Sequence, residues 1–157
     1  EIDASLPAGD DIHVRVLGCP VEDLAAKGAH PERWETLAFG KVPVPEFLNS
    51  LDIFVYHFHT RWTEAFGRTV VEAGLCERPL VLDPRLRQPF GDIATYCTPA
   101  EVKAAVMQLA GNPKDARERA KRARRTLAAQ YASETVGNRI ERIASDRGVG
   151  SRAEATV

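Results

Sequence analysis

Residues 53–83 read IFVYHFHTRWTEAFGRTVVEAGLCERPLVLD and hold a complete strand–helix–strand pattern. The run at residues 53–58 is continuously apolar apart from one histidine, as expected of a strand that is buried on both faces. Residues 64–76 follow with helical spacing, and residues 80–83 form a second short apolar run. This order predicts a strand and a helix followed by a parallel strand, the repeating unit of α/β proteins.

The same alternation continues on both sides of this stretch. Residues 12–17, 35–39 and 94–98 read as further strands. Helical patterns lie between and after the strands, at residues 21–29, 45–51, 98–109 and 113–143. We therefore predict a Rossmann-like, three-layer α/β domain with one mostly parallel sheet and helices on both faces. Ligands of such sheets bind at the carboxyl ends of the strands, so the loops after the five strands form the candidate site.

The length and composition fit one globular domain. The chain has 157 residues, of which 44% are hydrophobic and 27% are charged, and this balance excludes a wholly disordered protein. We assign residues 1–11 to a polar lead-in, residues 12–147 to the domain and residues 148–157 to a flexible polar tail. Since no apolar run approaches the roughly 20 residues that span a bilayer, we expect a cytoplasmic protein.

The charge is balanced overall but unevenly distributed. A formal net charge of −1 gives no overall field that would attract nucleic acid, so we expect no nucleic-acid partner. Residues 113–147 nevertheless hold ten Lys or Arg against five Asp or Glu, and this basic segment could contact acidic lipid. The alternative is a solvated helix face, because an apolar stripe repeats every three or four residues, at Ala116, Ala120, Ala123 and Leu127. We favour the solvated face and keep peripheral membrane contact as the other possibility.

The cysteines and histidines do not form a recognisable metal or disulfide pattern. Cys19, Cys76 and Cys97 are odd in number and widely spaced, which favours reduced thiols over a disulfide scaffold or zinc ribbon. His57 and His59 share one face of a strand, but two ligands do not complete a zinc site and no third lies nearby in the sequence. We expect no bound metal.

The segment with the most chemical information is residues 63–74, TEAFGRTVVEAG. Gly67 lies at the predicted helix start, where free backbone N–H groups and the helix dipole favour an anion. Glu72 lies among apolar residues, and a carboxylate there is costly to bury unless it accepts hydrogen bonds. Its partner is either Arg68, one turn back, or a ligand. Glu64 precedes Glu72 by eight residues, or roughly 12 Å of helix, so two carboxylates would flank an anion of nucleoside-diphosphate-sugar size.

These residues resemble a known family. Glu64 and Glu72, with seven residues between them, are similar to the paired-glutamate motif of retaining glycosyltransferases of the GT-B fold, and specifically to the C-terminal, donor-binding domain of glycosyltransferase family 4. Flanking segments that look similar are residues 13–18, 39–42, 46–48, 51–55 and 72–81. The resemblance covers about residues 12 to 145, which implies one half of a GT-B fold.

The resemblance implies a role for each candidate residue. Glu64 would be the catalytic residue that contacts hydroxyls of the donor sugar, and Glu72 would hold the ribose diol. The backbone amides that would hold the distal phosphate are those of Phe66, Gly67, Arg68 and Thr69. The residues that would meet the base, mainly through backbone, are Gly40, Lys41 and Val42. The family does not require a metal bound through Asp-x-Asp, and the chain has no such triplet, so the implied ligand is a nucleotide sugar without metal or other cofactor.

The chain also departs from the family pattern. The family's first strand and helix, with an Arg and a Lys that neutralise the diphosphate, have no counterpart here, and the missing strand should lie mid-sheet beside residues 53–58. The family's glycine-rich loop is replaced by residues 83–89, where Arg85 or Arg87 could supply positive charge. The acceptor domain is absent, and the first residue is not Met. We therefore expect a piece of a longer enzyme that transfers sugar to a glycan, lipid or small-molecule acceptor, and no transfer by this piece alone.

Two other hypotheses remain open from the sequence. The same scaffold could be a non-catalytic nucleotide-sugar sensor or interaction domain, because a fold alone does not define an activity. An unrelated α/β phosphate-binding enzyme or receiver-like domain would need an acidic cluster or a nucleophile at the strand ends. Asp83 is the lone acid at such a position, so we rank that hypothesis last.

Overall fold

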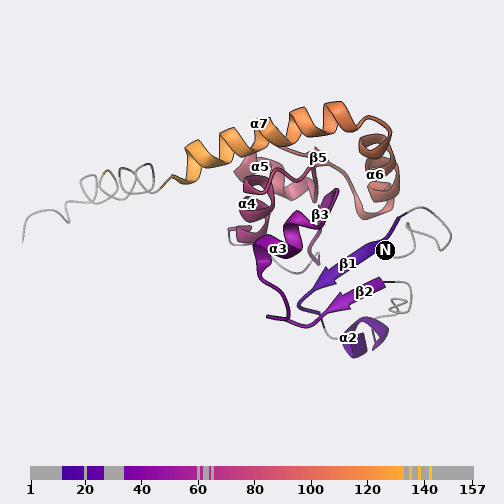
Figure 1. The fold of residues 1–157 in the computed structure, drawn as a ribbon. Coiled ribbons are helices and arrows are strands. Elements are labelled where there is room, and N and C mark those ends of the chain that lie inside the picture. The colour runs from indigo at the N-terminus through magenta and orange to yellow at the C-terminus, as the bar shows by residue number, and fades with distance from the viewer. Residues whose placement is uncertain are drawn as a thin grey trace, which may run out of the picture.

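A computed structural model describes most of the predicted domain. The described residues are 12–19, 21–26, 34–59, 61, 64, 66–132, 135, 138 and 142. The predicted lead-in and tail lie outside them. The described part has a Rossmann-like α/β architecture of short parallel strands and helices, as predicted from the alternating sequence pattern (Figure 1).

Each of the five predicted strand runs overlaps a strand. These are β1 (Val14–Leu17), β2 (Trp34–Leu37), β3 (Phe54–Tyr56), β4 (Leu80–Leu82) and β5 (Thr95–Tyr96). Every pairing among them is parallel, which confirms the prediction. The expectation of one continuous sheet is wrong for the described residues, because β1 pairs with β2 and a separate sheet has the order β3-β4-β5.

The break between the two sheets leaves β3 at an edge. The backbone groups of Phe54 and Tyr56 face β4, since the Phe54 N–H donates to Pro79 and the Tyr56 carbonyl accepts from Asp83. In a parallel strand the intervening residue, Val55, therefore turns its N–H and C=O to the other edge. No described strand pairs there. This edge is where the resemblance places a strand that the described residues do not supply.

Because Ala132 has an extended backbone with a ψ of 142°, the helix predicted over residues 113–143 ends at Tyr131, and several other helices also differ from their predicted ranges. The helices are α2 (Val21–Ala26), α3 (Val44–Asn49), α4 (Arg68–Leu75), α5 (Arg87–Phe90), α6 (Val102–Gly111) and α7 (Pro113–Tyr131), with 3-10 turns η2 (Pro84–Leu86) and η3 (Pro99–Glu101). The predicted range of residues 64–76 is too long at its start, because Gly67 precedes α4 with a left-handed φ of 69°; the helix start predicted at Gly67 is confirmed. The segment after β4, expected as a loop, is helical because Asp83 accepts the Arg85 N–H and Pro84 occupies the first position of η2.

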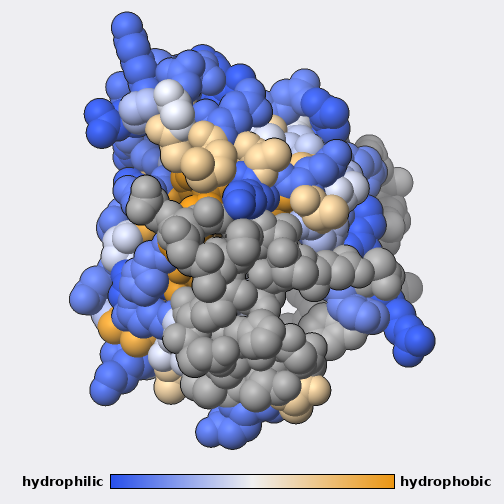
Figure 2. Space-filling view, turned by 90° about the vertical axis from the view of Figure 1, so that its right-hand side faces the viewer, coloured by the Kyte–Doolittle hydropathy of each residue, from blue (hydrophilic) through white to orange (hydrophobic). Residues whose placement is uncertain are grey.

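The larger core cluster lies where α7 crosses α4 (Figure 1), and a second cluster joins Val81 of β4 to α6. The predicted stripe of Ala116, Ala120, Ala123 and Leu127 is buried, which confirms its orientation, and the Lys and Arg residues of α7 are exposed. A Cβ on Gly74 of α4 would lie 2.2 Å from Leu127 Cδ1, so glycine permits this close helix packing. On the face shown in Figure 2, apolar side chains reach the surface between blue polar regions.

Candidate functional site

The N-terminus of α4 lies at the end of the loop that leaves the carboxyl end of β3. Gly67 caps this helix with a φ of 69°, and an added Cβ would lie 2.9 Å from two ring atoms of Phe90. The left-handed backbone and the close ring both require glycine. The sequence predicted this close approach at Gly67 but assigned it to a ligand, whereas Phe90 of α5 fills part of that space.

Glu64 lies directly against this helix start. Its Oε1 accepts the N–H of Gly67 at 2.9 Å and the N–H of Phe66 at 3.3 Å, and its Oε2 accepts the hydroxyl of Tyr56. Burial, with a smaller effect from the Glu64 hydrogen bond, raises the pKa of Tyr56 to about 12, so the phenol stays a donor. Two of the four amides expected to face a phosphate are therefore already bonded to a carboxylate.

Glu72 lies farther along the same helix and is paired. The Arg68 Nε donates to its Oε1 at 2.8 Å, across one helical turn. The Glu72 side chain is 31% exposed and that of Arg68 is 83% exposed, so the pair borders solvent and a ligand can reach both groups. Arg68 and Thr69, which carry the other two amides predicted for phosphate, are exposed in the first turn of α4. The Arg68 partner considered from the sequence is the one that Glu72 contacts here.

The loop after β2 forms a tight turn. The Lys41 N–H donates to the Ala38 carbonyl at 3.1 Å, and Gly40 has a φ of 75°, as residue i+2 of a type II turn requires. Gly40 and Lys41 are exposed, whereas Val42 is half-buried and packs against the core. Phe39, which the sequence prediction did not select, is 90% exposed at the tip of this turn. Its position just before the turn glycine was the available signal.

Asp83 and Arg85 form a clamp at the carboxyl end of β4. The Asp83 side chain is 5% exposed and takes two guanidinium hydrogen bonds from Arg85, at 2.9 and 2.7 Å. These bonds lower the pKa of Asp83. Arg85 also donates to the Phe58 carbonyl at 2.7 Å and lies 3.9 Å over the Phe58 ring, so it ties the loop after β3 to the loop after β4. Arg87 pairs with Asp92 at 2.8 Å, so both arginines proposed as replacement charge are paired with acids.

His57 also has a buried titratable side chain, close to Asp83 at the carboxyl end of β4. Its side chain is 5% exposed, its Nδ1 lies 3.9 Å from Asp83 Oδ2, and neither ring nitrogen has a hydrogen-bond partner among the described residues. Burial lowers the pKa of His57, which keeps the imidazole neutral. The sequence considered His57 only with His59 as a metal ligand. Within the described ranges, no group of three or more His, Cys, Asp or Glu is arranged to hold a metal ion.

The site therefore has two parts that the described contacts do not join. Glu64, Phe66 and Gly67 meet at the start of α4, with the Arg68–Glu72 pair beside them. The turn at residues 38–41 is separate: Phe39 lies against Gly18, at the carboxyl ends of β1 and β2. A scan against protein-family models found no match, and no curated protein matched the chain. None of the described helices is both long and apolar enough to cross a bilayer.

Proposed function

We propose that the chain binds a nucleotide diphospho-sugar as the donor-binding part of a retaining glycosyltransferase. The observation that supports this proposal is the oxyanion already held at the start of α4, where Gly67 and Phe66 donate their N–H groups to Glu64. Such amides bind phosphate for the same reason that they bind a carboxylate. The position at the carboxyl end of β3 is where ligands bind in parallel α/β sheets.

In this proposal the chain contributes by positioning and charge stabilisation. The distal phosphate takes the amides of residues 66–69, and Glu64 moves from them to hydroxyls of the sugar, since a carboxylate only accepts hydrogen bonds. Glu72 exchanges Arg68 for the ribose diol, and Gly40, Lys41 and Val42 meet the base. The amides then stabilise charge on the departing diphosphate while the acceptor attacks from the same face. A glycan, lipid or small-molecule acceptor would bind to a separate domain of a longer, cytoplasmic enzyme.

A non-catalytic nucleotide-sugar-binding domain is the second candidate function. The pairing of Arg85 with Asp83 and of Arg87 with Asp92 favours it, because neither guanidinium is available to offset a leaving diphosphate. Losing one preorganised electrostatic contact costs on the order of 100- to 1000-fold in rate. Binding tolerates that loss better than catalysis does.

Calorimetry on the chain separates a ribose role for Glu72 from an ion-pair role. Glu72→Gln should weaken the binding of uridine, guanosine or adenosine diphosphate more than the binding of inorganic pyrophosphate, which has no ribose. Glu77→Gln, which removes a carboxylate paired with Arg124 at 2.7 Å, is the matched control and should change neither affinity. Equal losses for the two ligands in Glu72→Gln would leave the Arg68 ion pair as its only role.

Glu64→Ala tests the oxyanion site itself. Removing the carboxylate frees the Gly67 and Phe66 amides and removes a negative charge, so pyrophosphate should bind more tightly than to the unaltered chain. An unchanged affinity would show that phosphate does not use these amides. In a longer enzyme that contains the acceptor domain, the same substitution should lower turnover more than nucleoside diphosphate affinity. Robust sugar transfer by residues 1–157 alone would contradict the two-domain requirement, and an inactive longer protein with an intact fold would favour the non-catalytic candidate.

A further inference from the structure

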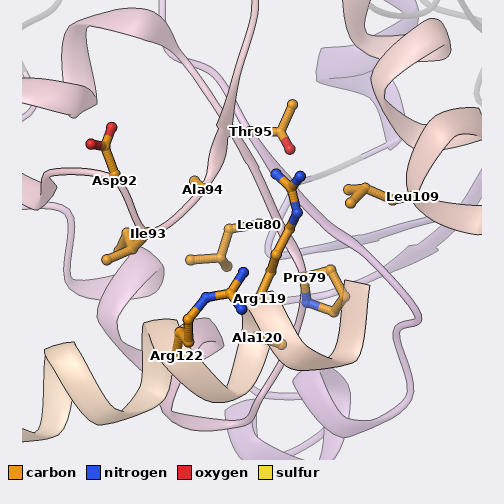
Figure 3. A pocket seen from close by; sticks show the side chains of 10 residues that line it. All are labelled: Pro79, Leu80, Asp92, Ile93, Ala94, Thr95, Leu109, Arg119, Ala120 and Arg122. Atoms are coloured by element: carbon orange, nitrogen blue, oxygen red, sulfur yellow. The ribbon is translucent and has the colours of Figure 1, made fainter. Parts of the chain in front are cut away.

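A small pocket lies between α7 and the amino ends of β4 and β5. The proposed donor site lies at the opposite, carboxyl ends of the strands. Leu80 begins β4 and Thr95 begins β5, and both line the pocket (Figure 3). Its volume is about 80 Å³. A water occupies roughly 30 Å³ in the liquid, so the pocket has room for two or three waters or one small tetrahedral anion.

Two arginines from α7 enter this pocket. Figure 3 shows the guanidinium of Arg119 extending toward Thr95 and that of Arg122 directed into the same space. Arg119 uses its Nε to bond Asp115 at 2.7 Å, and that bond leaves its terminal N–H groups for a ligand. Arg122 forms no ion pair with the part of the chain that the structure describes. The pocket therefore presents guanidinium donors from two successive turns of one helix.

The surroundings favour an anion over a cation. Asp92, the one acid that lines the pocket, already accepts two hydrogen bonds from Arg87, at 3.1 and 2.8 Å. Leu80 and Ala120 are 3% and 2% exposed and provide apolar walls. Arg119 and Arg122 are both exposed, so a ligand can reach their guanidinium groups, which form charge-assisted hydrogen bonds to phosphate oxygens. The Thr95 hydroxyl adds a donor of the kind that completes phosphate sites.

We propose that Arg119, Arg122 and Thr95 form a second binding site, for a phosphate monoester group. This site does not depend on the proposed donor site, because it shares no residue with it and lies at the other end of the strands. The phosphate could belong to a free metabolite or to a lipid headgroup, since further basic side chains of α7 such as Lys121 and Arg125 are exposed. Both sources present the same three phosphate oxygens to the arginines.

Titration followed by amide chemical shifts tests the pocket with two probes, inorganic phosphate and glycerol phosphate. The Thr95 and Ala120 amides should shift and saturate. Arg122→Ala should weaken binding on the order of tenfold or more, as expected for loss of charge-assisted hydrogen bonds. Arg125→Ala is the control, because it removes the same charge from an exposed position on the same helix outside the pocket lining, and it should change the affinity less than twofold. Thr95→Val should give an intermediate loss.

The outcomes separate a pocket from a diffuse basic surface. Equal losses in Arg122→Ala and Arg125→Ala, or shifts confined to residues 66–69, would overturn the proposal. A second arm uses vesicles with and without phosphatidic acid. Binding of both soluble phosphates at Thr95, with no gain on the acidic vesicles, identifies a free phosphate ester as the ligand. Selective binding to acidic vesicles that Arg122→Ala abolishes and Arg125→Ala preserves identifies a lipid headgroup.

Discussion

Gly67→Ala is the substitution whose effect the structure defines best. Gly67 has a φ of 69°, and an added Cβ would lie 2.9 Å from the Phe90 atoms Cε2 and Cζ. Phe90 is 2% exposed, so its ring has little freedom to move away. Gly40 is a matched control, because its φ of 75° is equivalent and an added Cβ would have no neighbour within 4 Å.

The two glycines separate a backbone cost from a packing cost. A left-handed conformation costs an L-residue about 1–2 kcal/mol, and the more rigid unfolded chain of the alanine variant offsets part of that. Gly40→Ala should therefore lower the free energy of unfolding by about 1 kcal/mol. Forcing a methyl group into a filled core adds about 1–3 kcal/mol. We expect Gly67→Ala to lose about 2–4 kcal/mol in total, with the excess over Gly40→Ala due to Phe90.

Urea unfolding, followed by far-ultraviolet circular dichroism, measures the free energy of unfolding of both variants. An unchanged m-value shows that their unfolding transitions are comparable with that of the unaltered chain. Phe90→Leu removes the contacted ring atoms. In a double-mutant cycle, Gly67→Ala should therefore cost at least about 1 kcal/mol less in the Phe90→Leu background than in the unaltered chain. Equal losses from Gly67→Ala and Gly40→Ala, or no coupling to Phe90, would refute the close approach of α5 to the start of α4.

Three further predictions concern buried side chains. Because burial lowers the folded-state pKa of His57, the unfolded chain takes up a proton first as the pH falls below about 6.5, so stability should fall from about pH 7 to pH 5. His57→Leu should flatten that part of the stability curve, and an unaltered slope would exclude His57 as its source. Leu127→Ala should cost about 2–5 kcal/mol because Leu127 is fully buried, whereas Met107→Ala, at a residue that is 50% exposed, should cost far less in the same urea assay. Burial raises the pKa of Cys97, so in native conditions its alkylation, mapped by mass spectrometry, should lag behind that of half-buried Cys76 until urea is added; equal native rates would contradict the burial.

The sequence predicted the parallel strands because their signal is local. Short apolar runs such as residues 53–58 and 80–83 are visible without knowledge of their partners. The division into two sheets was not predictable in this way, because pairing depends on which strand edges meet. The edge of β3 at Val55 has no pairing strand among the described residues, and no local sequence pattern indicates this.

The candidate site shows the same limit at the level of side chains. Spacing placed Glu72 one turn from Arg68, and the pair forms. Spacing also extended the start of the helix back to Glu64, although Gly67 in a left-handed conformation precedes the first helical residue, Arg68. The sequence did not predict the Asp83–Arg85 clamp, because its role in joining two loops depends on Phe58, 27 residues away. Arg85 contacts both the backbone and the ring of Phe58. Exposed loop arginines are the usual expectation when that partner is unknown.

Glu64 lies where the phosphate and the sugar of the proposed donor would meet. Its carboxylate accepts the same amide N–H groups that a phosphate would need, so those amides can bind phosphate only after the carboxylate has moved away. A nucleoside diphosphate alone offers Glu64 no hydroxyl at the sugar position, and its phosphate would then lie beside the like charge of the Glu64 carboxylate. A complete nucleotide sugar supplies that hydroxyl and compensates the lost amide bonds. The proposed site would therefore favour intact donor over its own diphosphate product, and that difference in affinity would aid product release.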